Sequence, residues 1–574
     1  IVQSTAEITA TTFGSGRVRD ITINGRSVDI NNARITNITR GTGDGGSIFI
    51  DANNIRLTNT GRLNLNNFAQ GNTGDVRINA QNVNIVEGGR IELGTYAEGN
   101  TGNVAINARD TVVLDGELRN DGSRIFNIVA GPSAVGNAGD IQINTRSLSI
   151  TNGAALNTNT YGAGNAGNIT INASESILLD GTNSAVAGSS ILSRVRGRGR
   201  GNAGDINITT RLFTLRNRTQ ILNRTEGRGN AGQLNITADE LSLDNNSSIS
   251  SSVESTAIGN GGMLHLNVRQ LSLNNQSRIS ASTFGQGDAG QILIAANESV
   301  LLNNNSEIST SVSNQGRGIG GSIEIQTGSL NLNNQSSIEA TTVSGQGGNI
   351  NLQVSNLLLM RRNSQITATA GTAGAGGDGG NITINTPLIA AIPRENSDIT
   401  ANAFKGRGGN IQLTASGILG LEFRAAQTVN SDITASSQFG VSGTVTINNL
   451  QVDPASGLVE LPEQVTDPSN QVLVGCAARE GNSFTVTGRG GLPEDPTATI
   501  RGQTVWQDLQ DFATEIANAE PQKPQANKSE PPLQIVEATG WIINDLGQVE
   551  LVASIPTKTR LPPEFNCHDW QRLR

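Results

Sequence analysis

The hexapeptide Gly136-Asn-Ala-Gly-Asp-Ile141 recurs almost unchanged at residues 164–169 and 201–206. Looser copies of this Gly motif begin at Gly43, Gly71, Gly99, Gly229, Gly259, Gly287, Gly318, Gly345, Gly377 and Gly406. Between Gly16 and Gly443 the motif returns about every 30 residues, most often every 28. Self-similarity at this period is typical of solenoid proteins, in which each repeat packs only against its neighbours.

Each repeat contains three short runs in which apolar and polar residues alternate. In one repeat these runs are Val76-x-Ile78, Val83-x-Ile85 and Ile91-x-Leu93, with Gly- and Asn-rich corners between them. Alternation at period two indicates strands with one buried face, and no repeat has the 3.6-residue period of a helix. We therefore predict an all-β fold, a right-handed parallel β-helix over residues 1–449 with about 15 coils of 28–30 residues and three strands per coil.

Alignment of the Gly motifs places the same aliphatic pair in successive coils. The pairs that should stack are Val76/Ile78, Val104/Ile106, Ile141/Ile143, Ile169/Ile171, Ile206/Ile208, Leu234/Ile236, Ile292/Ile294 and Ile323/Ile325. They predict a long aliphatic core, one side chain thick, that leaves no room for Phe or Trp. Asn-rich corners such as Asn274-Asn275-Gln276-Ser277 recur one coil apart, and we expect their amides to form ladders, the alternative being a polar binding strip.

Composition limits the kinds of function that the chain performs. The 574 residues contain 69 Gly but only 12 Phe, 2 Tyr and 3 Trp, and the formal net charge is −9. This charge excludes a general nucleic-acid binder, although it does not exclude a local basic patch. The sequence has no apolar run of about 18 residues, so we predict no transmembrane helix.

A change of composition near Leu450 marks a second domain. Of the 15 Pro residues, 12 follow this point, whereas 60 of the 69 Gly residues precede it. Residues 450–574 are therefore predicted to form a separate C-terminal module, with a helix at 503–516, a Pro-rich linker at 519–532 and a hairpin at 533–553. Such a module is suited to cover the open end of a solenoid.

Eight arginines stand out as a candidate site for an anionic ligand. They are Arg194, Arg196, Arg198, Arg200, Arg216, Arg218, Arg224 and Arg228. Because they fall within two successive coils, stacking should bring them into one basic area that suits sulfate, phosphate or carboxylate groups. The alternative is a solvated corner in which arginine serves solubility.

The remaining chemistry points away from catalysis. The chain has only two His residues, so imidazole-based metal sites are excluded, and we predict no catalytic residue, no metal and no cofactor. Asp75, Asp140 and Asp205 lie in the Gly motif but are replaced in other copies, which indicates turn residues. Cys476 and Cys567 lie in the C-terminal module and are predicted to form a disulfide, with free thiols or an intermolecular bridge as alternatives.

The repeats resemble the β-helical shaft of filamentous-haemagglutinin-like exoproteins of the two-partner secretion system. The Gly-Asn-Ala-Gly-Asn-Ile type of repeat is similar to the large cyanobacterial members, over about residues 1–449. The resemblance extends to Gln471-Val-Leu-Val-Gly-Cys476, Phe484–Pro493 and Glu537-Ala-Thr-Gly-Trp541, but the family's amino-terminal secretion domain is not recognisable. The resemblance implies export through an outer-membrane β-barrel partner and a location at the cell surface or outside the cell.

Three functions are compatible with these observations. The first is a secreted or surface-exposed adhesin shaft without catalytic activity, which attaches to surfaces, cells or glycans. The second is a β-helix enzyme that cleaves polysaccharides, and the third is a scaffold that carries an effector or a docking module. We expect the first, because the regular pattern spans every coil and leaves none with clustered titratable groups.

Overall fold

The structure of the chain is a computed structural model. It describes residues 2–449, except residue 4 and the gaps 117–121, 182–187, 314–315, 317 and 373, together with 540–543 and 549–552. The contacts divide the chain into two units, Ile1–Gly457 and Leu458–Arg574. In the second unit, β35 (Gly540–Ile543) pairs antiparallel with β36 (Val549–Val552). The helix expected at 503–516, the linker at 519–532 and both cysteines lie outside the described residues, as does the rest of the expected hairpin.

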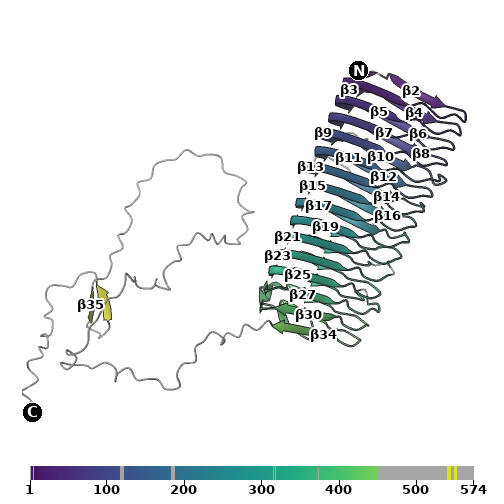
Figure 1. The fold of residues 1–574 in the computed structure, drawn as a ribbon. Coiled ribbons are helices and arrows are strands. Elements are labelled where there is room, and N and C mark those ends of the chain that lie inside the picture. Colours follow the sequence, from purple (N-terminus) through teal and green to yellow (C-terminus); the bar gives the residue numbers. More distant parts are fainter. Residues whose placement is uncertain are drawn as a thin grey trace, which may run out of the picture. The chain divides into compact units, whose positions relative to one another are not determined.

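The first unit is a right-handed parallel β-helix, and each turn adds one rung to each of two sheets (Figure 1). The larger sheet, sheet A, contains β1 (Val2–Gln3), β3 (Ile21–Asn31), β5 (Ile48–Thr58), β7 (Val76–Val86), β9 (Val104–Asp115), β11 (Ile141–Thr151), β13 (Ile169–Asp180), β15 (Ile206–Arg216), β17 (Leu234–Asp244), β19 (Leu264–Leu273), β21 (Ile292–Asn303), β23 (Ile323–Asn333), β25 (Ile350–Met360), β27 (Ile382–Asn385), β28 (Leu388–Ala391), β30 (Asn410–Ala415), β31 (Gly417–Leu419) and β34 (Thr444–Asn449).

The smaller sheet, sheet B, lies across the coil from sheet A. It contains β2 (Glu7–Thr12), β4 (Arg34–Thr39), β6 (Arg62–Asn67), β8 (Arg90–Thr95), β10 (Arg124–Val129), β12 (Ala155–Thr160), β14 (Ser190–Val195), β16 (Gln220–Thr225), β18 (Ser248–Val253), β20 (Arg278–Ser280), β22 (Glu307–Ser309), β24 (Ser337–Glu339), β26 (Gln365–Thr367), β29 (Asp398–Thr400), β32 (Glu422–Phe423) and β33 (Asp432–Thr434). The one helical element among the described residues is the 3-10 turn η1 (Pro393–Glu395).

The coil differs from the expected one in how its strands are divided. The first two of the three expected runs are continuous in most coils, so that Val76-x-Ile78 and Val83-x-Ile85 both belong to β7. A register irregularity between Ala80 and Asn82 marks the bend between them. The pairing of β7 with β9 resumes directly after this irregularity, at Asn82 and Thr111, so that the two runs form one bent strand.

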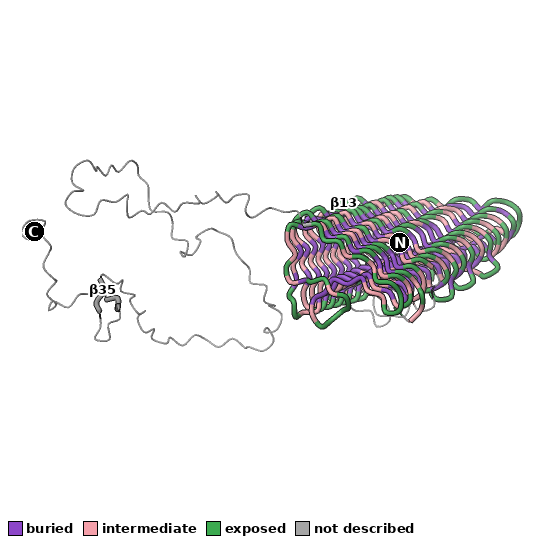
Figure 2. The backbone as a smooth tube through the Cα atoms, turned by 90° about the horizontal axis from the view of Figure 1, so that it is seen from below, coloured by how far each residue is buried: buried purple, intermediate pink, exposed green. Residues whose placement is uncertain are grey.

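The core follows the predicted register. Val76 and Ile78 pair with Val104 and Ile106 of the next coil, and the other aliphatic pairs stack in the same way. These residues are buried, and buried stretches of backbone form purple bands that repeat from coil to coil in Figure 2. One aromatic residue lies in this core despite its narrowness, since Phe213 is only 1% exposed.

Asn residues build the corner between the two sheets. Asn275 and Asn304 both have positive φ, a conformation that Asn tolerates better than most residues. The Asn304 side chain donates a hydrogen bond to Asn275 Oδ1 at 2.9 Å and accepts one from Asn334 at 2.7 Å. The expected amide ladder is therefore present at this corner.

An extra rung covers the C-terminal end of sheet B. After β31 the chain passes beyond the last coil, and β32 pairs in parallel with β33. Arg424 of this excursion forms an ion pair with Asp432, whose side chain is fully buried next to that of Asp398. Asp398 accepts hydrogen bonds from the Asp432 backbone and from the Gln427 side chain, at 2.9 and 2.7 Å.

Candidate functional site

Three of the predicted arginines meet on the outer face of sheet B. Arg194 pairs in register with Arg224 of the next coil, and Arg196 follows directly after β14. Glu226 accepts from both Arg196 and Arg224, at 3.4 and 2.9 Å, and Glu254 accepts from Arg224 at 3.0 Å. Burial and the neighbouring positive charges of Arg196 and Arg224 lower the pKa of Arg194 to about 10, so its guanidinium stays charged at neutral pH.

Three more of these arginines lie in the Gly-rich corner that follows sheet B. Arg200 and Arg228 are bridged in successive coils, and Arg198 lies in the turn just before Arg200. All three are exposed and form no ion pair with any residue in the described part of the chain. Their charges are therefore available to an anionic ligand, unlike those of Arg196 and Arg224.

The prediction that all eight arginines form one basic area is wrong for Arg216 and Arg218. They lie at the corner before β16, whereas Arg224 and Arg228 lie near and beyond its other end. Six residues of strand separate the two corners, which is about 20 Å. Arg216 is also bound to Asp180 at 2.8 Å. The two arginines thus belong to the Asn corner, because position around the coil, and not coil number alone, decides which side chains meet.

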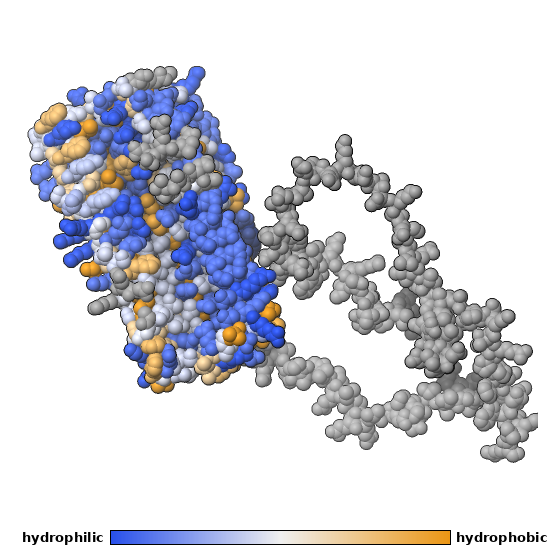
Figure 3. All heavy atoms as spheres, turned by 180° about the vertical axis from the view of Figure 1, so that it is seen from behind, coloured by the Kyte–Doolittle hydropathy of each residue, from blue (hydrophilic) through white to orange (hydrophobic). Residues whose placement is uncertain are grey.

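Exposed aromatic side chains line the same corner as Arg196 and Arg200. Between residues 2 and 449 the chain has nine Phe and two Tyr, and seven of these eleven lie along this one edge. We call Phe13, Phe68, Tyr96, Tyr161, Phe284, Phe404 and Phe439 the aromatic edge. Five of the seven are at least 39% exposed. The face of the β-helix drawn in Figure 3 is largely hydrophilic, with hydrophobic side chains gathered in a few places.

Ring contacts join neighbouring coils at two places on this edge, Phe68 with Tyr96 and Phe404 with Phe439. The rings of Phe68 and Tyr96 stack with centroids 4.8 Å apart, and the Arg40 guanidinium lies 5.1 Å from the Phe68 centroid. Farther along, Arg196 lies 5.3 Å from the centroid of Tyr161 and donates to its hydroxyl at 3.1 Å. Guanidinium groups therefore contact rings at two places on this edge.

The aromatic edge was not predicted, although the sequence contains a signal for it. Five of its residues stand three positions before a Gly of the motif, as in Phe68-Ala-Gln-Gly71 and Tyr96-Ala-Glu-Gly99. Arg40 has the same spacing from Gly43. Counting aromatic residues in register with the Gly motif would have revealed the edge.

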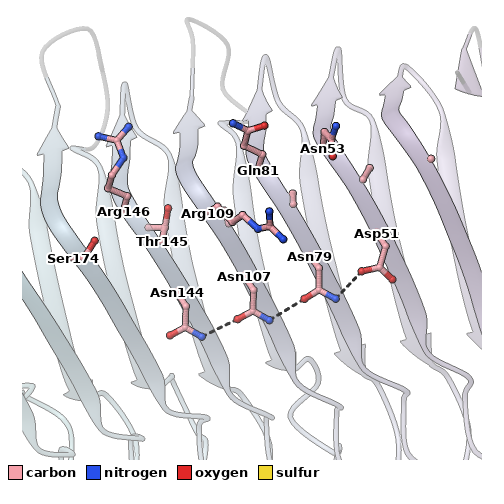
Figure 4. A pocket seen from close by; sticks show the side chains of 14 residues that line it. Asp51, Asn53, Asn79, Gln81, Asn107, Arg109, Asn144, Thr145, Arg146 and Ser174 are labelled. Carbon is pink, nitrogen blue, oxygen red and sulfur yellow. Dashed lines mark hydrogen bonds between the residues drawn. The ribbon is translucent and has the colours of Figure 1, made fainter.

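A groove of about 750 Å³ lies where the strands of sheet A bend, on the side away from the core. Its floor is a ladder of side chains in which Asn79 donates to Asp51 at 2.7 Å, Asn107 to Asn79 at 3.0 Å and Asn144 to Asn107 at 2.8 Å (Figure 4). Small residues at the bend, such as Ala80, leave the space open. We call this feature the amide groove.

Charged and polar side chains form the other side of the amide groove. Gln81, Arg109 and Arg146 lie there in successive coils (Figure 4). Arg146 binds Glu175 at 2.7 Å and lies 3.8 Å from Asp110. Arg109 is exposed and has no ion pair with the residues that the structure describes.

The acidic residues of the Gly motif serve the turns. Asp75, Asp140 and Asp205 each accept a hydrogen bond from a backbone N–H of the next coil, at 2.7–2.8 Å. His265 is exposed on sheet A. Within the described residues, no three His, Cys, Asp or Glu side chains are grouped so as to hold a metal, and no helix is long and apolar enough to cross a membrane.

Comparison with known proteins identifies no relative of this chain. No protein-family model, no curated protein and no solved structure matches the chain. The fold and the geometry of these surfaces therefore carry the functional argument.

Proposed function

We propose that the chain is the shaft of a surface-exposed or secreted adhesin, without catalytic activity, that attaches to glycans through the aromatic edge and the arginines beside it. The observation that carries this proposal is the placement of seven of the eleven aromatic side chains of residues 2–449 on one edge instead of in the core. The edge holds two clusters of adjacent rings, Phe68 with Tyr96 and Phe404 with Phe439, and exposed apolar clusters rimmed by polar residues are typical of binding sites.

The chemistry of this edge suits a sugar polymer that carries negative charge. Aromatic rings offer rigid apolar surface at a low cost in conformational entropy, and sugar rings present apolar C–H faces. Arg198, Arg200 and Arg228 are exposed in the same corner, where guanidinium groups bind carboxylate or sulfate groups bidentately. Repetition along the rod would add many weak contacts together.

Export and location belong to the same proposal. The resemblance of the repeats to two-partner secretion exoproteins supports passage through an outer-membrane β-barrel partner and a final place at the cell surface or outside the cell. A regular rod with few cysteines is compatible with that route.

A glycan array probed with the full chain tests the proposal. We expect binding to acidic glycans and about tenfold weaker binding when Phe68 and Tyr96 are both replaced by Ser. The matched control is Phe423→Ser, which removes a ring that is 59% exposed but lies in the C-terminal excursion. Equal loss in the control, or no loss in the edge variant, would contradict the proposal.

The enzymatic alternative is tested with the same glycans. The buried carboxylates Asp398 and Asp432 form a close pair, but both side chains have no exposed surface and Arg424 covers Asp432. A carboxyl group must reach the scissile bond to act as acid or base. We therefore expect no release of reducing ends from acidic polysaccharides, and sustained release would favour a polysaccharide-cleaving enzyme instead.

A further inference from the structure

We propose that the amide groove binds a linear polysaccharide that carries carboxylate groups, with its chain parallel to the axis of the β-helix. This site lies on sheet A and is separate from the aromatic edge. It therefore does not depend on whether the edge binds glycans.

The hydrogen bonds of the ladder leave half of each amide unused. Asn107 donates one N–H to Asn79 and accepts one bond from Asn144. A side-chain amide has two N–H donors and two acceptor lone pairs, so each inner Asn keeps one donor and one lone pair for a ligand. Hydroxyl groups, which both donate and accept, are the natural partners of such a surface.

The ladder is long, straight and evenly spaced. It continues from Asn144 to Asn172, which donates at 3.0 Å, so that five side chains from Asp51 to Asn172 lie in line. At one coil per about 4.8 Å the five span about 19 Å. The distance between successive coils is close to the length of one sugar unit in an extended chain. Successive sugar units would therefore meet successive amides.

The charges of the groove favour carboxylates on that chain. Arg109 is exposed without an ion pair among the described residues, and Arg146 and Arg109 come from adjacent coils on the same side of the groove. The ladder's one acidic residue, Asp51, accepts from Asn79 at its far end. Arg109 therefore brings an unpaired positive charge to the middle of the groove, whereas Arg146 shares its charge with Glu175 and Asp110.

A peptide fits this surface less well than a glycan. On both sides of the bend the backbone groups of β7, β9 and β11 are already paired with neighbouring coils, so the groove offers no free strand edge. An extended peptide would have only side-chain amides to satisfy its own backbone.

The test uses the full chain and a labelled oligogalacturonate, with a neutral cello-oligosaccharide of equal length as the uncharged comparison. We expect the galacturonate to bind and the neutral oligomer to bind at least about tenfold more weakly. Replacing Arg109 and Arg146 by Ser should weaken galacturonate binding by about tenfold or more. Asn107→Leu should also weaken it, because this change interrupts the ladder.

The matched control is Arg56→Ser with Arg77→Ser, which removes the same charge from neighbouring coils outside the groove. Unchanged affinity in the groove variants, or equal loss in this control, would overturn the proposal, as would equal affinity for the two oligomers. Loss of galacturonate binding in the Phe68 and Tyr96 double variant, with none in the groove variants, would also overturn it and would assign binding to the aromatic edge.

Discussion

Replacement of Ile208 by Asp is expected to open one coil of the β-helix without unfolding the rest. Ile208 is 2% exposed and lies in register between Ile171 and Ile236. Loss of a buried isoleucine side chain costs about 2–5 kcal/mol, and a buried carboxyl without a partner adds about 1–3 kcal/mol even when protonated. We therefore expect a loss of roughly 5 kcal/mol, concentrated in this coil and its neighbours because solenoid coils contact only adjacent coils.

Hydrogen exchange measured by mass spectrometry reports this loss coil by coil. A loss of roughly 5 kcal/mol corresponds to between about three and four orders of magnitude in protection, and it should appear in β13, β15 and β17. The control is Thr209→Asp, which places the same group on the exposed side of the same strand and should change stability by less than about 0.5 kcal/mol. Normal protection and melting of Ile208→Asp would refute the stacked core.

Three further results are expected. Gly164 has φ of +137°, and a side chain at this position would collide with the Gly136 carbonyl, so Gly164→Ala should lower the melting temperature clearly. Gly14 has open space around it, so Gly14→Ala should leave the melting temperature unchanged. Equal shifts in the two variants would contradict this packing. Burial raises the pKa of the Asp398 carboxyl, so the stability that this group contributes is full below the ordinary carboxyl pKa and is lost as the pH rises through the raised pKa. In unfolding titrations at several pH values, Asp398→Asn should make the free energy of unfolding depend less on pH. The same pH dependence in the native chain and the variant would contradict this prediction. Cys476 and Cys567 should appear as one linked peptide in non-reducing mass spectrometry, and alkylation of both thiols in the native protein would exclude the disulfide.

The fold was predictable because the hydrophobic period fixes which side chains face inward. The stacking of Val76 on Val104 followed from aligning the Gly motifs, since a shift of one residue would turn every aliphatic side chain outward. The period did not predict that the first two runs are continuous in β7. One bent strand and two separate strands show the same alternation of apolar and polar residues.

The surfaces were harder to predict than the core. Arg194 and Arg224 meet as expected, but Arg216 and Arg218 do not join them, because proximity in a solenoid requires the same position around the coil as well as adjacent coils. The aromatic edge obeys that rule and was visible in the spacing from the Gly motif. The excursion that contains β32 was not predictable from the repeats, because it occurs once and has no counterpart in the other coils. It adds a strand beyond β33 at the end of sheet B.

The most direct test of the proposed attachment is the affinity of the full chain for a sulfated polysaccharide, measured at increasing salt. The test compares the native chain with a variant in which Arg198, Arg200 and Arg228 are replaced by Ser. We predict weak binding that falls as salt rises, and loss of most of it in the variant while hydrogen-exchange protection of the coils stays intact. Affinity that changes neither with salt nor with the three substitutions would contradict the account.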